Sequence, residues 1–452
     1  MEDRTQQVGD GGGNEVTRQM LPGSATVGVT QMSGDPMRTV QGVATRALEM
    51  ECIPGNRYGL AGERSNLHLL MLIKSVNLAL GRRMPLNVCL VIDRSGSMEG
   101  EPLDYVKRAC GYVVDLMEPT DVLSIVTFEE QVDVVMPARR VVNKTLIKEH
   151  IQRIQPGNTT NLYDGLVTGC AQVASVHAEG MVNRVLLLTD GEPTSGIRDF
   201  ASIVNQVAEQ KSRGITITAL GFGSEYNEEL VAGIARRSGG NYYYIQRPDL
   251  IPEVFRRELE TLMTITAKNP RITLQLAKWI QLRQVYGTMP AIQGRNIEVG
   301  LPDIERGSII STLVELEVDR HPAAAFRIAR AQLTYDDAVS NRTERIEADA
   351  ILDFTSDRSR IADGENAVVQ RELEVALASR NLEKTLMGMR TQQIASPTVL
   401  SEMQRTRTVL LNQGKTQEAA DLQAAMDSIR QGGEIEKTLI GTIYNLDRGK
   451  SS

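Results

Sequence analysis

This sequence of 452 residues has few aromatic residues, no long uninterrupted apolar run and no excess of basic charge. It also lacks a cysteine motif for metal binding. The longest apolar stretch, residues 67–80, is interrupted by His68, Lys74 and Asn77 and is too short to span a bilayer. The four cysteines show no spacing that would indicate zinc, so we expect reduced thiols. A net charge of −7 and an aromatic content of 4% argue against a protein that binds nucleic acid or an anionic membrane.

Targeting and catalytic motifs are lacking as well. The first residues, MEDRTQQVGDGGGNEVTRQM, contain no apolar segment of the secretory kind, so we expect a cytoplasmic protein unless a leader has been removed. We find no DxDxT motif, no paired His/Asp set and no P-loop lysine. The histidines lie far from one another and from the polar motif segments, at His68, His150, His177 and His321. We therefore expect no enzyme.

The length favours two or three domains. Residues 1–45 are rich in Gly, Gln, Thr and Ser and predict a disordered tail. Residues 85–264 alternate strand and helix, which predicts a doubly wound, Rossmann-like α/β domain. Residues 265–358 lose the helical period and predict a β sandwich, with which strands in residues 46–84 are expected to pair. Residues 363–446 predict a helical bundle, with a tetratricopeptide-like unit as the alternative.

Polar residues gather where strands of the α/β domain are expected to end. The run VCLVID predicts a strand that is buried on both faces. The polar positions at the same predicted edge are Asp93, Ser95 and Ser97 after this strand, Thr159 and Thr160 before a helix, and Asp190 after VLLLT. Ligands bind at this edge of open α/β sheets, and carboxylate and hydroxyl oxygens suit Mg²⁺, Mn²⁺ or Ca²⁺. Because only two of these residues are carboxylates, the cation is expected to attract a further carboxylate from elsewhere.

Three of these segments resemble the metal-ion-dependent adhesion site of von Willebrand factor type A domains, and the resemblance covers residues 85–264. The segments are DRSGSM at 93–98, TTN at 159–161 and LTDG at 188–191. The resemblance implies that a divalent cation, Mg²⁺ or alternatively Mn²⁺ or Ca²⁺, is bound by Asp93, Ser95, Ser97, Thr160 and Asp190. Many members have glycine where this chain has Thr159, which leaves Thr159 and Thr160 open as the direct ligand.

The flanking strands and helices resemble intracellular bacterial proteins in which the type A domain is inserted in a β sandwich, an architecture similar to inter-alpha-trypsin inhibitor heavy chains. The resemblance implies a scaffold that captures an acidic residue of a protein partner through the cation. The alternatives are a homo-oligomer bridged by the metal or by the helices, and a metal-dependent hydrolase. Acidic residues considered for a bridge, by charge alone, are Asp336, Asp337, Asp349 and Asp357. Arg94 and Glu99 are interpreted as solvated charges at the rim of the site.

Overall fold

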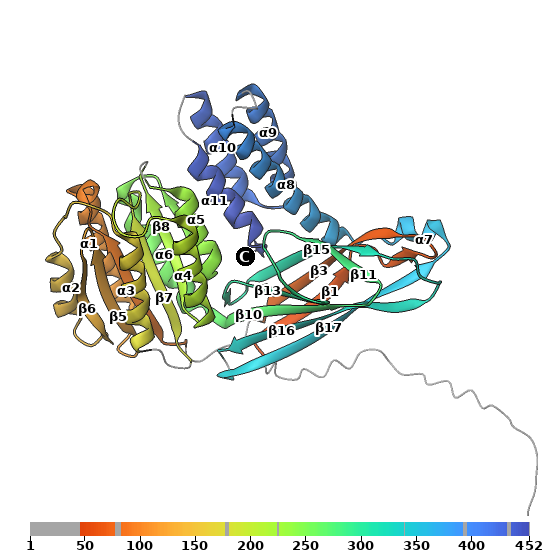
Figure 1. The fold of residues 1–452 in the computed structure, drawn as a ribbon, viewed down its shortest axis with the longest axis horizontal. Coiled ribbons are helices and arrows are strands. Elements are labelled where there is room, and N and C mark those ends of the chain that lie inside the picture. Colours follow the sequence, from red (N-terminus) through yellow and green to blue (C-terminus); the bar gives the residue numbers. More distant parts are fainter. Residues whose placement is uncertain are drawn as a thin grey trace, which may run out of the picture. The chain divides into compact units, whose positions relative to one another are not determined.

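The computed structural model describes residues 46–76, 83–176, 180–223, 226–338, 340–391, 396–431 and 435–451. The tail predicted at residues 1–45 lies outside these described residues. Within them, the sheet topology confirms the predicted fold class (Figure 1): a doubly wound α/β unit, a pair of packed β sheets and a helical region near the C-terminus.

The α/β unit is built on a six-stranded sheet in the order β6-β5-β4-β7-β8-β9, in which only β6 runs antiparallel to its neighbour. The strands are β4 (Leu86–Asp93), β5 (Val122–Phe128), β6 (Val132–Arg140), β7 (Val182–Thr189), β8 (Thr216–Phe222) and β9 (Tyr242–Ile245). Every residue of β4, β5, β7 and β8 is buried. Such continuous burial is typical of parallel strands that helices cover on both faces.

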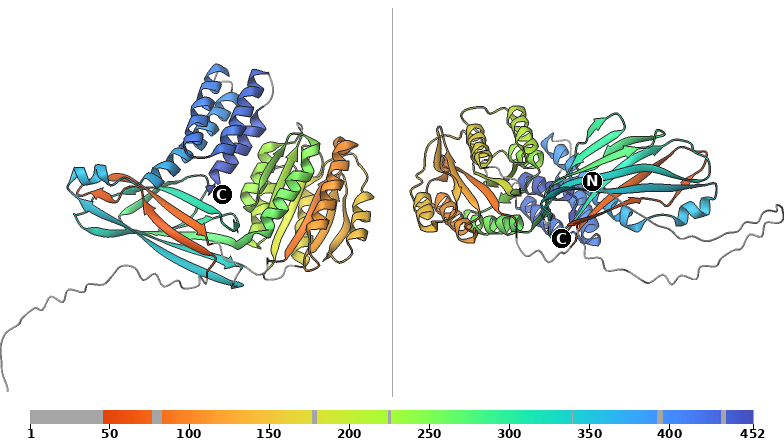
Figure 2. Two further views of the ribbon diagram at one scale, coloured as in Figure 1. Left: turned by 180° about the vertical axis from the view of Figure 1, so that it is seen from behind. Right: turned by 90° about the horizontal axis from the view of Figure 1, so that it is seen from below.

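Helices pack on both faces of this sheet, as the view from below in Figure 2 shows. They are α1 (Glu101–Leu116), α2 (Lys144–Gln152), α3 (Leu162–Ser175), α4 (Phe200–Ser212), α5 (Glu228–Ser238) and α6 (Ile251–Met263). Val88 and Leu90 of β4 share an apolar core with α1, α2 and α6, whereas Cys89 and Val91 share another with α3, α4 and α5. Alternate residues of the strand therefore support opposite helical layers.

Two sheets form the β sandwich around one apolar core. The first contains β1 (Leu48–Pro54), β3 (Ser65–Ser75), β15 (Ile309–Val318), β11 (Ile280–Val285) and β18 (Lys450–Ser451). The second contains β12 (Ala291–Gln293), β13 (Asn296–Gly300), β10 (Ile265–Leu276), β16 (Ala325–Asp337), β17 (Arg342–Thr355), β2 (Tyr58–Leu60) and β14 (Ile304–Glu305). Strands from before and after the α/β unit thus lie in the same sheets.

The α/β unit is inserted between β3 and β10 of the sandwich. β3 pairs antiparallel with β15 from Ser65 opposite Val318 to Lys74 opposite Ile309. Ser75 Oγ at the end of β3 lies 3.3 Å from Thr266 Oγ1 near the start of β10. The chain therefore leaves the sandwich and re-enters it at neighbouring positions.

The C-terminal helices share a core of their own. They are α8 (Ala367–Arg390), α9 (Ser396–Asn412), α10 (Thr416–Arg430) and α11 (Glu436–Asp447), and the short α7 (Arg358–Asp363) precedes them. β18, which follows α11 and pairs with β15, was not anticipated from the sequence. Within the described part of the chain, no helix has the length and apolar character needed to cross a membrane.

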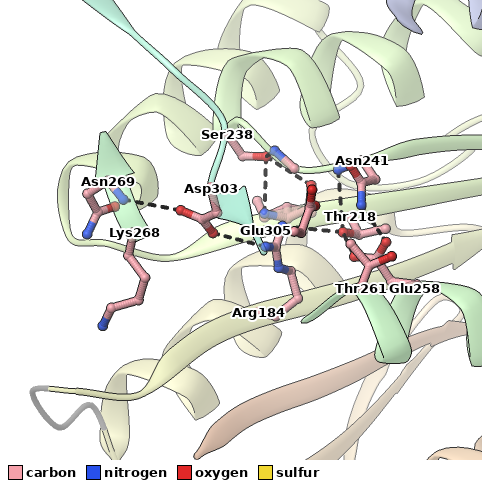
Figure 3. Close-up of polar contacts among 12 residues, drawn as sticks. Arg184, Thr218, Ser238, Asn241, Glu258, Thr261, Lys268, Asn269, Asp303 and Glu305 are labelled. Atoms are coloured by element: carbon pink, nitrogen blue, oxygen red, sulfur yellow. Dashed lines mark hydrogen bonds and ion pairs between the residues drawn. The ribbon is translucent and has the colours of Figure 1, made fainter. Parts of the chain in front are cut away.

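Buried polar contacts join the α/β unit to the sandwich (Figure 3). Arg184, near the start of β7, forms an ion pair of 3.0 Å with Asp303, which precedes β14. Glu258 of α6 is fully buried and accepts hydrogen bonds of 2.5 Å from both Thr218 and Asn241. These contacts lie near the amino ends of β7 and β8. The carboxyl ends of the strands, where the candidate ligands lie, are at the opposite edge of the sheet.

Candidate metal centre

Asp93 is the last residue of β4 and has no exposed surface. Its Oδ1 accepts a hydrogen bond of 2.9 Å from the main-chain N–H of Ser95, the turn that an aspartate makes with the residue two positions on. The chain then enters a short 3₁₀ turn, Gly96–Met98. This turn places the hydroxyl oxygens of Ser95 and Ser97 3.2 Å apart, so the DxSxS spacing presents two hydroxyls beside the strand end.

Asp190, which directly follows β7, meets the same loop. Ser97 donates its hydroxyl hydrogen to Asp190 Oδ1 at 2.9 Å, and the Ser95 hydroxyl lies 3.5 Å from the same oxygen. Thr189, the residue before Asp190, supports the other carboxylate, since its hydroxyl donates to Asp93 Oδ2 at 2.7 Å. The structure therefore brings together Asp93, Ser95, Ser97 and Asp190, and their ligation of a metal stays a prediction.

Thr160 reaches the same edge, and its side chain is 4% exposed. A Cβ added to Gly191, the neighbour of Asp190, would lie 3.5 Å from Thr160 Oγ1. The Thr159 hydroxyl instead lies 3.4 Å from the Ser195 hydroxyl. This geometry favours Thr160 as the hydroxyl closer to the carboxylates, and its ligation of a metal stays a prediction.

The electrostatics of the two carboxylates suit a cation. Burial raises the pKa of Asp93 to about 7, although hydrogen bonds from Thr189 and Ser95 oppose the shift. Burial also raises the pKa of Asp190, against hydrogen bonds from Ser97 and Ser95. Among the described residues, no Lys, Arg or His forms an ion pair with either carboxylate. Two buried acids without a basic partner are costly to ionise unless a cation is bound.

The donor set decides which cations fit. The oxygens available are carboxylates and neutral hydroxyls, which suit hard cations such as Mg²⁺, Mn²⁺ and Ca²⁺. No group of three or more His, Cys, Asp or Glu side chains is arranged to hold a metal in the portion of the chain that the structure describes. A cation at this edge would therefore depend on the hydroxyls as much as on Asp93 and Asp190.

Arg94, the charged residue next to Asp93, pairs with other carboxylates. The guanidinium of Arg94 lies 2.9 Å from Asp133 and 3.4 Å from Glu129, and Glu99 is exposed. His68 on β3 contacts Tyr286, and the imidazole of His321 stacks on Phe326 in the sandwich. His177 lies outside the described residues.

Sequence reasoning missed Thr189, Thr194 and Ser195. The first supports Asp93, and the other two contact the threonine loop. The only signal for Thr189 was a polar residue between the apolar run VLLL and Asp190. Thr194 and Ser195 lie in a polar loop, GEPTSGIRD, whose composition does not distinguish supporting residues from solvated ones.

Known proteins share this sequence pattern and fold. A family model for the von Willebrand factor type A domain matches residues 87–257. An uncharacterized protein of Synechocystis sp., sll0103, is 32% identical over 272 residues, which cover 58% of this chain and 64% of that protein. Human inter-alpha-trypsin inhibitor heavy chain H4 is 30% identical over 167 residues, which cover 35% of this chain and 18% of that protein. Each match thus spans less than two thirds of the relative's length.

Two solved structures resemble the chain beyond the matched domain. One is a von Willebrand factor type A protein from Catenulispora acidiphila, with a TM-score of 0.70, 16% identity and coverage of 84% of this chain and 90% of that one. The other is the ArnB paralog VWA2 from Sulfolobus acidocaldarius, with a TM-score of 0.61, 15% identity and coverage of 89% and 98%. At these identities the likeness concerns the fold. Together with the sequence match, it identifies residues 87–257 of this chain as a von Willebrand factor type A domain.

Proposed function

We propose that this chain is a protein-binding module that depends on a divalent cation, with Mg²⁺ as the first expectation. The cation would be held by Asp93, Ser95, Ser97, Thr160 and Asp190. When bound, it would offer an open coordination position to an acidic side chain of a partner protein. The observation that carries the proposal is the buried pair of carboxylates surrounded by hydroxyls, without an ion-pair partner among the described residues.

Each residue of the centre has a separate role in this proposal. Asp93 and Asp190 supply the negative charge, and their burial strengthens the attraction between these charges and the cation. Ser95 is 2% exposed and supplies a hydroxyl from the floor of the site. Ser97 is exposed, so the centre is open to solvent on its side, where a partner could approach.

A metal-dependent hydrolase is the alternative from another functional class. It would need a nucleophile or a general base beside the cation. In the described part of the chain, the side chains that hydrogen-bond to Asp93 and Asp190 are the hydroxyls of Thr189, Ser95 and Ser97. The carboxylates that these hydroxyls contact are the assigned ligands of the cation, which leaves no separate general base to activate a nucleophile, so we favour binding over hydrolysis. Metal-dependent turnover of a phosphoester, lost in Asp190→Ala, would support the hydrolase.

Homo-assembly through the metal is the second alternative, and the acidic residues of the sandwich give it little support. Each of the four accepts hydrogen bonds or ion pairs within its own chain: Asp336 from Thr343, Asp337 from the N–H of Ala47, Asp349 from Arg330 and Asp357 from Ser359. A partner of a different kind therefore remains our proposal. Light scattering of the full chain with and without EDTA tests the alternative, because a metal-bridged oligomer would dissociate in EDTA.

The setting that we propose is the cytoplasm. All four cysteines are free thiols, and Cys89, Cys110 and Cys170 are buried. Free, buried thiols fit a reducing compartment. Fractionation of cells that produce the full chain tests this part of the proposal.

Calorimetric titration of the full chain with Mg²⁺ and with Mn²⁺ tests the centre directly. We expect binding of one cation, and Asp93→Asn should weaken it at least about tenfold because a charged ligand is lost. The matched control is Asp133→Asn, since Asp133 is an exposed carboxylate that pairs with Arg94. Partner capture from lysate in Mg²⁺ and in EDTA then tests recognition. A wild-type chain that binds neither cation would refute the proposal.

A further inference from the structure

The loop that carries Thr159 and Thr160 is held by the loop that carries Asp190. The main-chain N–H of Thr160 donates to Thr194 Oγ1 at 2.9 Å. In return, the N–H groups of Thr194 and Ser195 lie 3.0 Å and 3.3 Å from the Thr160 carbonyl oxygen. Three hydrogen bonds therefore fix the main chain of Thr160, and the Thr159–Ser195 hydroxyl contact adds a fourth.

The other side of the threonine loop is held by the DxSxS loop. Gly157 N–H donates to the carbonyl oxygen of Arg94 at 2.6 Å, and Gly96 N–H donates to that of Asn158 at 3.3 Å. Asn161 closes the loop, because its N–H donates to the Glu129 carbonyl oxygen at 2.8 Å. The position of Thr160 is thus set from both sides by the loops that also present the carboxylates.

The loop that follows Asp190 packs closely against the threonine loop at Gly196. A Cβ at this position would lie 2.2 Å from Asn161 Oδ1, and the residue has a positive φ of 68°. Both features require glycine. The segment from Thr194 to Gly196 therefore packs against the threonine loop without room for a larger side chain at Gly196.

We propose that Thr194 is a positioning residue of the metal centre, which holds the Thr160 hydroxyl within reach of the cation through the main chain of Thr160. This inference rests on the proposed function, because it assigns a support to the same cation site. Thr194 is itself exposed, so its hydroxyl is not required to fill the core. Ser195 has a lesser role, because its side chain contacts only the Thr159 hydroxyl among the hydrogen bonds described.

The inference also explains why threonine is accommodated at position 159. The Thr159 hydroxyl faces Ser195 and lies apart from the contacts of Asp190, which are made with Ser95 and Ser97. Thr159 thus strengthens the attachment between the two loops, whereas Thr160 faces the carboxylate edge. The two neighbouring threonines have separate tasks.

Titration of the full chain with Mn²⁺ tests the role of Thr194. Thr194→Val removes the hydroxyl with little change in size, so we expect Mn²⁺ binding about three- to tenfold weaker than in the wild type. Thr194→Ser keeps the hydroxyl and should bind within about twofold of the wild type. Ser195→Ala keeps the main-chain N–H that faces Thr160 and should also stay within about twofold.

The outcomes separate this inference from the proposed function. If the wild type binds Mn²⁺ and Thr194→Val binds equally well, Thr194 does not position the centre. If Thr194→Ser is as weak as Thr194→Val, or Ser195→Ala is as weak, the assignment is also wrong. If the wild type binds no cation, the proposed function fails and the inference fails with it. Circular dichroism without metal should show the same folded state for all variants, so that a change in Mn²⁺ affinity concerns the site.

Discussion

The Ser97 hydroxyl donates a hydrogen bond of 2.9 Å to Asp190 Oδ1, across a separation of 93 residues in the chain. The contact forms because β4 and β7 are neighbouring parallel strands, with Ile92 opposite Leu188. Residues that follow such strands must emerge at the same edge of the sheet. Strand order, rather than proximity in sequence, therefore assembles the candidate centre.

Cation binding should raise the free energy of unfolding of the wild type far more than that of Asp190→Asn. A ligand that binds only the folded state at about one hundred times its dissociation constant adds about 2.7 kcal/mol to the free energy of unfolding. Without the Asp190 charge, affinity at least about tenfold weaker should reduce the added stability to about 1.4 kcal/mol or less. Thermal unfolding with Mg²⁺ or EDTA measures it. Asp133→Asn, as control, should respond like the wild type, and an equal response of Asp190→Asn would exclude Asp190 as a ligand.

Valine substitutions should distinguish the two threonines. Thr160→Val removes a hydroxyl from the carboxylate edge and should weaken Mn²⁺ binding by about tenfold or more. Thr159→Val removes only the contact with Ser195 and should change the affinity by less than about threefold. Calorimetric titration measures both. The reverse order of the two effects would make Thr159 the ligand.

Glycines in two helices should respond oppositely to alanine. A Cβ at Gly169 of α3 would lie 2.2 Å from Val91 Cγ2 of β4, whereas nothing lies within 4 Å of the corresponding position at Gly111 of α1. Gly169→Ala should therefore lower the free energy of unfolding by about 1–3 kcal/mol through overpacking. Gly111→Ala should raise it by up to about 1 kcal/mol, since alanine favours helix. Urea unfolding measures both, and equal effects would show that α3 does not pack this closely.

Breaking the buried ion pair between the α/β unit and the sandwich should lower the free energy of unfolding far more than breaking an exposed ion pair. Arg184 and Asp303 have side chains that are 3% and 8% exposed. Asp303→Asn leaves a buried arginine without its partner, so we expect a loss of about 3–5 kcal/mol. Asp349→Asn breaks an ion pair with Arg330, which is 40% exposed, and should cost at most about 1 kcal/mol. Urea unfolding midpoints compare the variants, and similar losses would contradict the burial of the first pair.

The stability of the chain should depend on the ionisation of Asp447. Burial raises the pKa of this carboxyl from 3.8 to about 6, Arg236 and Ser379 oppose the shift, and Glu383 adds to it. The folded state then binds the proton more tightly than the unfolded state, so the contribution of Asp447 to stability falls as the pH rises from about 4 to about 6. Relative to Asp447→Asn, the wild type should lose on the order of 2 kcal/mol over this interval. Urea unfolding at several pH values measures the difference, and a constant difference would refute the shift.

The fold class was predictable because its periodicity is visible in the residues. The run VCLVI before Asp93 is apolar throughout, as a parallel strand covered on both faces requires, and the structure buries every residue of β4. The loss of helical period after residue 265 likewise predicted the sandwich strands. The strand pairings were less accessible, since β2 and β18 contribute only three and two residues and carry no pattern of their own.

The candidate ligands were predictable from spacing and resemblance, but their supports were not. Asp93 and Ser95 could be singled out because they directly follow an apolar strand and belong to the DRSGSM segment. Thr194 contacts Thr160 across 34 residues and leaves no comparable spacing signal. The sequence does indicate that Arg184 needs a partner of opposite charge, because it is a charged residue in the otherwise mostly apolar strand VNRVLLL. Nothing in the sequence pointed to Asp303, which lies 119 residues away.

The closeness of Ser75 and Thr266, whose hydroxyl oxygens are 3.3 Å apart, makes the α/β unit removable in principle. Chain ends that nearly touch can be joined by a short turn without stretching the strands that carry them. Joining β3 to β10 through a few glycines would therefore yield a continuous sandwich chain. The same proximity would let a different unit of similar end spacing be grafted between β3 and β10.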